Sequence, residues 1–182
     1  MGIKGLLKFY KIFKQLRIDP DDGIIRSKYG IRYLLFSDDS ILAIEDELRD
    51  IVGKDVAKGL TYRIGYEAGM RFAKPFREIF MGEESSRIGR KCAEFAQIAG
   101  WGKHKICGSL ESGKAIVIVY DSPLSGLKSS EKEPVCNFHC GLLAGSASAI
   151  TGRRVVGEEV NCAAKGDDFC KFILKFKNDG RY

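Results

Sequence analysis

Hydrophobic residues recur every three or four positions through most of the first half of the chain. This period predicts helices over residues 38–52, about 55–81 and about 85–99, with Gly53 ending the first of them. An amphipathic helix is also expected over residues 1–18, followed by a turn at residues 19–23 and a hairpin over residues 23–36. The long second helix contains Gly59, Gly65 and Gly69, and also Pro75, a residue type that kinks or breaks helices. Glycine weakens a helix, so we expect another backbone or a ligand to approach these glycines closely.

The second half changes to a period of two. Residues 103–110 and 114–120 predict a strand pair, and residues 155–162 and 169–176 predict a closing hairpin. Between them, Pro134 is suited to open a helix of small residues that ends at Gly152. Helices segregated from strands predict an α+β fold, an antiparallel sheet packed against a layer of helices. The length of 182 residues predicts a single domain over residues 1–182.

Composition narrows the class of protein. The apolar-rich stretch over residues 140–150 is too short to span a bilayer, and the first eight residues lack a signal-peptide core, so we expect a cytoplasmic protein with no membrane span. The net charge of +6 combines 30 basic with 24 acidic residues, which argues against a nucleic-acid clamp. The basic residues between 4 and 17 fit the solvated face of the first helix. Its apolar stripe predicts a homodimer and consists of Leu6, Leu7, Phe9, Phe13 and Leu16.

The six cysteines fall into two groups. Cys92 and Cys107 lie inside a predicted helix and strand, where a thiol usually serves as a small buried hydrophobe. The candidate metal ligands are one carboxylate and three thiols, Cys136, Glu159, Cys162 and Cys170, which together supply four ligands for tetrahedral zinc. The spacing of the last two leaves a disulfide or unpaired thiols open. His139 and Cys140 are spare ligands.

A linear motif runs through residues 136–172 in the order C-x-F-x2-G-x3-G, G-[RK]-x-V and E-x2-C-x3-G-x3-C-x-F. Its positions are filled by Cys136, Phe138, Gly141, Gly145, Gly152, Arg153, Val155, Glu159, Cys162, Gly166, Cys170 and Phe172. This pattern resembles the 4-vinyl reductase domain, and the resemblance extends over about residues 31–176. It implies a fold like that of trafficking-complex subunits and haem-based nitric oxide sensors, with an apolar ligand cavity. In the aromatic-sensing activators of this family, cysteines and a glutamate hold zinc, and these ligands carry over to Cys136, Glu159, Cys162 and Cys170.

Motifs for catalysis are missing from the sequence. Neither G-x-S-x-G nor a strand-linked G-x-G-x-x-G is present, and the loop at residues 108–114 departs from a phosphate loop at Ala115. We therefore predict a small-molecule-binding regulatory domain with a structural zinc rather than an enzyme. The alternatives are an accessory protein or reductase acting on a tetrapyrrole vinyl group, and a structural assembly subunit.

The expected ligand is small and hydrophobic or aromatic. We expect its pocket between the glycine-bearing helix and the sheet, because ligand pockets are mostly apolar and the glycines make room on one helix face. The aromatic residues predicted to line it are Phe72, Phe76, Phe95, Trp101 and Phe138.

Overall fold

The N-terminal part of the chain forms a small antiparallel sheet. The computed structural model describes residues 16–27, 32–126 and 132–177, and the chain divides into two compact units, Met1–Ser37 and Asp38–Tyr182. The prediction of one domain over residues 1–182 stays a prediction. In the first unit, β1 (Leu16–Asp19), β2 (Ile24–Ser27) and β3 (Arg32–Tyr33) pair in the order β1-β2-β3.

The first unit corrects one end of the predicted N-terminal helix. Residues 1–15 of that helix lie outside the described residues, but Leu16–Asp19 is a strand. Ile18 pairs with Ile25, and the turn between the strands contains Gly23 at a φ of 62°. This conformation is available to glycine at no steric cost, so the local turn chemistry favours the hairpin over a continued helix. The predicted pairing of β2 with β3 is confirmed, with Ile25 opposite Tyr33, but the second strand is shorter than expected, because residues 34–36 are not part of it.

Five helices and a short 3₁₀ turn lie in the described part of the second unit. They are α2 (Asp38–Val52), α3 (Lys54–Ile79), α4 (Ser85–Ile98), α5 (Pro123–Gly126), α6 (Asn137–Thr151) and η1 (Ala163–Lys165). The three helices predicted from the period are confirmed, and Gly53 separates α2 from α3 at a φ of 78°. Pro75 lies inside α3 without ending it. Pro134 does not open α6, because the first helical residue is Asn137 and Cys136 is the N-cap.

The sheet of the second unit has four antiparallel strands. These are β4 (Lys103–Ser109), β5 (Lys114–Tyr120), β6 (Val155–Asn161) and β7 (Cys170–Phe176), in the order β4-β5-β7-β6. Alternate residues of the two central strands, among them Val117 and Phe172, are buried and pair across β5 and β7. Side chains alternate between the faces of a strand, so this pattern gives the sheet one fully covered face.

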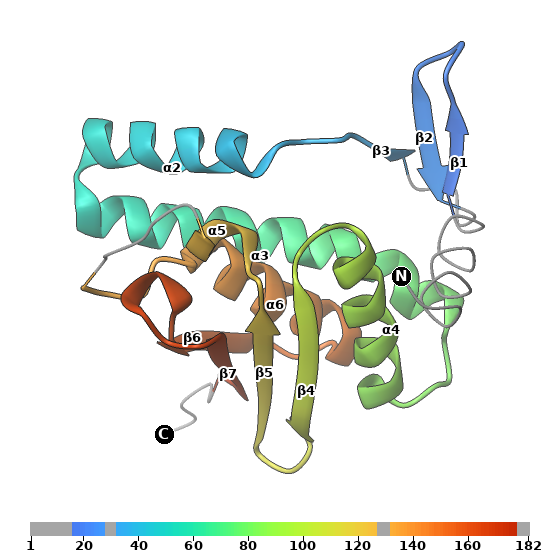
Figure 1. Ribbon diagram of the computed structural model, residues 1–182. Helices are drawn as coiled ribbons and strands as arrows, with labels where there is room; N and C mark the ends of the chain where they lie inside the picture. Colours follow the sequence, from blue (N-terminus) through green and yellow to red (C-terminus); the bar gives the residue numbers. More distant parts are fainter. Residues whose placement is uncertain (1–15, 28–31, 127–131, 178–182) are drawn as a thin grey trace. The chain divides into compact units, whose positions relative to one another are not determined.

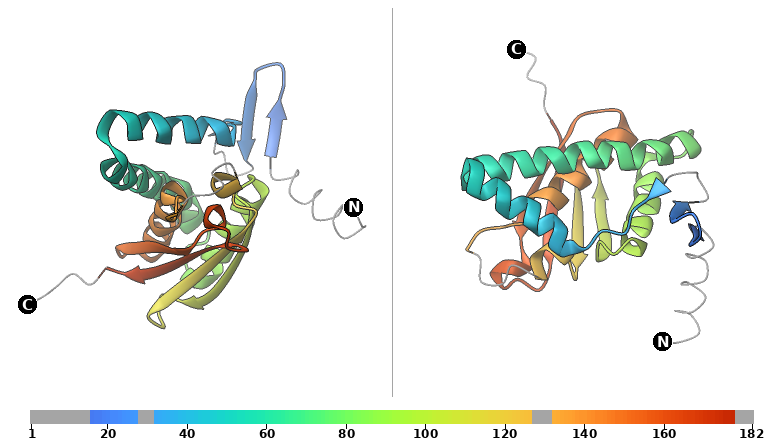
Figure 2. Two further views of the ribbon diagram at one scale, coloured as in Figure 1. Left: turned by 60° about the vertical axis from the view of Figure 1, so that its left-hand side comes forward. Right: turned by 90° about the horizontal axis from the view of Figure 1, so that it is seen from above.

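The helices of the second unit stack on that face in layers. α4 packs against β4, α6 packs against β6 and β7, α3 packs on α6, and α2 packs on α3 (Figure 1, Figure 2). The predicted α+β class, an antiparallel sheet against a layer of helices, is confirmed. No helix in the described residues is long and apolar enough to cross a membrane.

Glycines on both helices allow α3 and α6 to pack backbone against backbone. A Cβ atom at Gly65 or Gly69 would come within 3.0 Å of a carbonyl oxygen of α6, and one at Gly141 or Gly145 would do the same to α3. The expected close approach at Gly65 and Gly69 is therefore confirmed, and the approaching group is a backbone. Gly59 is different, because a Cβ atom added there would meet nothing within 4 Å.

Candidate metal centre and ligand cavity

The four predicted metal ligands converge at the point where the closing hairpin meets the N-terminus of α6. Their ligand atoms, one from each of Cys136, Glu159, Cys162 and Cys170, all lie within 4.8 Å of one another. The Sγ atom of Cys136 is 3.9 Å from that of Cys162 and 3.7 Å from that of Cys170. All three cysteines are fully buried and free, so the sulfur atoms are in contact without a disulfide.

Local backbone contacts hold the cluster in shape. Glu159 accepts a hydrogen bond from the backbone N–H of Cys136 through Oε2 at 2.9 Å, so the carboxylate caps α6 from outside the helix. This external cap explains why the helix begins at Asn137. In the hairpin loop, Asp167 accepts the N–H of Cys162 at 2.8 Å, and the N–H of Ala163 points to the Sγ of Cys170 at 3.4 Å.

The carboxyl group and three thiols of this buried cluster lie close together, so each affects the pKa of its neighbours. Burial raises the pKa of Glu159 to about 8, and nearby Cys162 contributes to this rise. Hydrogen bonds from Cys136 and Cys170 lower the pKa of Cys162, while the hydrogen bond to Cys162 raises the pKa of Cys136. The other oxygen of Glu159, Oε1, is buried with no hydrogen-bond partner among the described residues. A buried acceptor without a partner is costly, and a cation within reach of the cluster would satisfy it.

The spare ligands lie outside this cluster. Cys140 packs towards Gly157, and burial raises the pKa of its thiol to about 12. His139 directs Nε2 towards Nε2 of His104 at 3.3 Å. Of the two cysteines expected in the core, Cys92 is buried and Cys107 is half-buried. Burial raises the pKa of Cys92 to about 12, as expected of an unreactive thiol.

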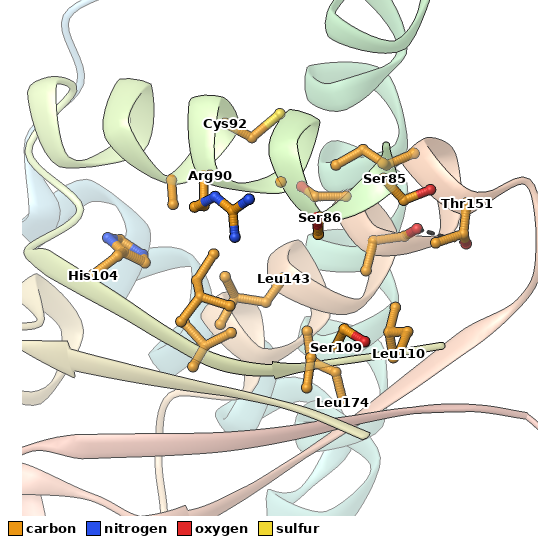
Figure 3. A pocket seen from close by; sticks show the side chains of 18 of the residues that line it. Ser85, Ser86, Arg90, Cys92, His104, Ser109, Leu110, Leu143, Thr151 and Leu174 are labelled. Atoms are coloured by element: carbon orange, nitrogen blue, oxygen red, sulfur yellow. Dashed lines mark hydrogen bonds between the residues drawn. The ribbon is translucent and has the colours of Figure 1, made fainter. Parts of the chain in front are cut away.

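A cavity of about 120 Å³ lies between α4, α6 and the sheet (Figure 3). Its apolar wall includes Ala93 of α4, Leu143 and Ala147 of α6, and Ile106, Val117 and Leu174 of the sheet. The sequence predicts a pocket between the glycine-bearing helix and the sheet, and the cavity differs from that position. Because the glycines let α3 pack directly on α6, α6 fills the predicted space, and the cavity opens beside it under α4.

The five aromatic residues predicted to line a pocket have different places. Phe72 lines the cavity. Phe76 and Phe95 are buried and pack on each other, with ring centroids 5.8 Å apart, and both also contact Phe72. Trp101 and Phe138 stack at 5.8 Å, and Trp101 meets the edge of His139. The aromatic residues thus form two clusters, of which one reaches the cavity.

Two histidines belong to the polar part of the cavity wall. His104 and His139 both line it, and His139 is fully buried. Burial lowers the pKa of His139 to about 3, with His104 adding to the effect, and burial also lowers the pKa of His104. Both rings are therefore neutral near pH 7.

Sequence reasoning assigned only Phe95 of α4 to the pocket and missed the face of α4 that lines this cavity. The helix has a second face of mostly small residues, Ser86, Gly89, Arg90, Ala93 and Ala96, all of which line the cavity. Their spacing of three and four residues is the signal that marks one helix face. The other face of α4 is apolar and includes Ile88 and Phe95. Its hydrophobic residues determine the periodicity of this segment, so the face of small residues is less evident in the sequence.

An antiparallel sheet covered by helices, with the three cysteines and one glutamate gathered at its closing hairpin, defines the class of the 4-vinyl reductase fold. Residues 116–176 match the 4-vinyl reductase domain, which confirms the resemblance found in the sequence. Residues 11–109, more than half of the chain, match the family described as activator of aromatic catabolism. The chain belongs to this family.

Individual relatives agree with this assignment. The transcriptional regulatory protein XylR of Pseudomonas putida is 25% identical over 79% of this chain, but the match covers only 27% of XylR. The chain thus spans about a quarter of the length of the curated regulators it matches. Among solved structures, the phenol-responsive sensory domain of the transcription activator PoxR, solved with phenol, has a TM-score of 0.81 at 20% identity, covering 100% of this chain and 94% of that one. A vinyl-4-reductase family protein from Methanocaldococcus jannaschii has a TM-score of 0.55 at 18% identity, covering 98% and 97%.

Proposed function

We propose that this chain is a regulatory sensor domain that binds a small, mainly apolar molecule in the cavity under α4. The observation that carries the proposal is the cavity itself, about 120 Å³ with a wall rich in aliphatic side chains and with His104 and His139 among its polar groups. An apolar cavity of about 150 Å³ takes up benzene, so this volume suits a ligand with one ring. The phenol bound by the sensory domain of PoxR, which shares the fold, supports the same ligand size.

A structural zinc ion held by Cys136, Glu159, Cys162 and Cys170 is the second part of the proposal. In a tetrahedron with Zn–S bonds of about 2.3 Å, the sulfur atoms are about 3.8 Å apart. The Sγ separations of 3.9 and 3.7 Å fit that geometry, and the unpartnered Oε1 of Glu159 supplies the fourth donor. Four protein ligands leave no open position, which is typical of a structural site.

The metal site and the cavity share α6. Cys136 is the N-cap of this helix, and His139, one turn later, belongs to the cavity wall. Zinc therefore fixes the end of the helix from which a ligand is contacted. Through the same helix, a change at the cavity reaches α3, because the two helices touch backbone to backbone. This path supports a regulatory rather than a catalytic use of the cavity.

Calorimetry with phenol and with toluene tests the binding function. A ligand at one hundred times its Kd stabilises the folded state by about 2.7 kcal/mol, so both calorimetric heat and a raised Tm are expected. Ala147→Leu places extra atoms in the cavity and should abolish binding. Ala99→Leu, just beyond α4 and outside the cavity lining, is the matched control and should bind as the unmodified chain does.

Failure of a broad set of single-ring compounds to bind, together with unchanged Tm values, would remove the basis of the sensor function. The vinyl-reductase and assembly-subunit alternatives stay hypotheses. Visible absorption of the purified protein would favour a tetrapyrrole partner.

A further inference from the structure

One cationic side chain points into the largely apolar cavity. Arg90 extends from α4 into the space that the lining residues surround, with its guanidinium directed away from the helix (Figure 3). Arg90 is exposed, so the charge keeps contact with water. Nothing in the packing of α4 requires a cation at this position, because the buried residues of the helix are Ile88, Cys92 and Phe95.

Several other polar groups of the wall already have partners. The hydroxyl of Thr151 donates to the carbonyl of Ala147 at 2.8 Å, and that of Ser146 donates to the carbonyl of Gly69 at 3.3 Å. His104 and His139 are hydrogen-bonded to each other. These hydrogen bonds hold the wall together and leave Nδ1 of His139 as a buried acceptor with no partner among the described residues. An unprotonated nitrogen cannot donate to a carboxylate.

Arg90 has no such partner among the residues that the structure describes. Its guanidinium forms neither a hydrogen bond nor an ion pair there, and this includes Glu111, the acidic residue that also lines the cavity. Glu111 follows β4 in the turn to β5. The guanidinium of Arg90 therefore offers N–H donors without a partner among the described residues on one side of a largely apolar space.

A guanidinium group discriminates between ligands by their charge and by the arrangement of their oxygen atoms. Its planar fork matches the two oxygens of a carboxylate and binds them through paired, charge-assisted hydrogen bonds. A hydrocarbon ligand would gain nothing from it, and a hydroxyl would engage only one of its donors. Apolar walls beside the fork suit a ring attached directly to the carboxylate.

We propose that the cavity selects a small aromatic carboxylate, with the ring between α4, α6 and the sheet and the carboxylate on the guanidinium of Arg90. This inference rests on the proposed ligand-binding function and names the class of its ligand. The volume of about 120 Å³ limits the ligand to one ring.

Calorimetric titration of the full chain with benzoate, phenol and toluene, at equal ionic strength and pH 7, tests this assignment. Benzoate is expected to bind more tightly than the two neutral compounds, and added salt should weaken benzoate alone. Arg90→Gln should weaken benzoate about tenfold or more while leaving phenol and toluene little changed. Arg90→Lys, which keeps the charge but loses the fork, should recover part of the loss.

Arg87→Gln is the matched control, because Arg87 lies on the same helix but outside the cavity lining. It should bind all three compounds normally. Binding of phenol or toluene without binding of benzoate, or unchanged benzoate binding by Arg90→Gln, would overturn the carboxylate assignment and leave the sensor function standing. Equal loss of all three compounds in Arg90→Gln would also overturn it, because Arg90 would then maintain the cavity rather than recognise a charge. If none of the compounds binds the unmodified chain, the sensor function fails as well.

Discussion

The Nε2 atoms of His104 and His139 lie 3.3 Å apart in the wall of the cavity. His104 places Nδ1 3.0 Å from the carbonyl oxygen of Gly102, which can only accept a hydrogen bond. The proton of His104 is therefore on Nδ1, its Nε2 accepts, and Nε2–H of His139 donates. Nδ1 of His139 is then an unprotonated, buried atom, in agreement with its lack of a partner among the described residues. The pair is stable only while both rings are neutral.

This pairing predicts a loss of stability in acid. Burial holds the pKa of His139 at about 3 in the folded chain, against 6.5 as its ordinary value. Below pH 6.5 His139 is protonated in the unfolded chain but stays neutral in the folded chain. The free energy of unfolding therefore falls as the pH drops from 6.5 towards 3. At pH 5 the loss through His139 is about 2 kcal/mol, and His104 acts in the same direction.

Urea unfolding at pH 7.5 and pH 5 measures this loss. His139→Gln lowers stability at both pH values, but the difference between them should be smaller than in the unmodified chain by about 2 kcal/mol. Effects of acid on a metal site are common to both proteins and cancel in the comparison. Identical pH dependence of the two proteins would contradict the assignment.

Removal of a cysteine from the cluster should release the metal. We expect one zinc per chain by elemental analysis, and none in Cys162→Ala or Cys170→Ala. Cys92→Ala is the matched control, since Cys92 is buried in α4 away from the cluster. Chelation should lower the Tm of the unmodified chain, because zinc binds only the folded site. A protein that is free of metal although it was purified without chelator would argue against the zinc site. A mass lower by two hydrogen atoms, which shows a disulfide, would do the same.

The sequence was sufficient for the parts of the fold that depend on local pattern. The period of 3.6 in α2 and α4, and the alternation in β5, follow directly from which face each element buries. Glu159, Cys162 and Cys170 lie within one hairpin, so their convergence is a local matter. Only Cys136 comes from a more distant part of the chain; its position near a helix end made it a candidate ligand, and the family motif implied the same residue.

The cavity wall was less predictable because helix packing determines it. Aromatic residues such as Phe76 and Phe95 identify apolar faces, but not whether those faces meet each other or an empty space. Gly65 and Gly69 indicated a close approach without saying whether a ligand or a backbone makes it. The answer depends on α6, whose own glycines complete the contact, and on the position of α4 over the space left beside it.

Replacing either of two glycines of α3 by alanine should change the folding stability in opposite directions. Gly69→Ala forces a methyl group against the carbonyl of Leu142 and should cost about 1 to 3 kcal/mol of folding stability. Gly59→Ala, ten residues earlier in the same helix, meets nothing within 4 Å and should stabilise the protein by about 0.5 to 1 kcal/mol. Urea unfolding of both variants measures the contrast. Equal effects would show that α3 and α6 are farther apart in solution.

The predicted homodimer can be tested at two surfaces. The N-terminal stripe falls mainly on residues outside the described part of the chain, whereas α2 and α3 expose aliphatic side chains at Ile44, Ile51, Val56 and Ile64, each about half or more exposed. α2 and α3 are neighbouring helices, so these exposed apolar groups make them a candidate interface. Light scattering should give a dimer for the full chain and a monomer for a chain beginning at Asp19. A dimer that survives this truncation but is lost in Ile51→Glu would assign the contact to α2 instead, and a monomeric full chain would contradict dimerisation at either surface.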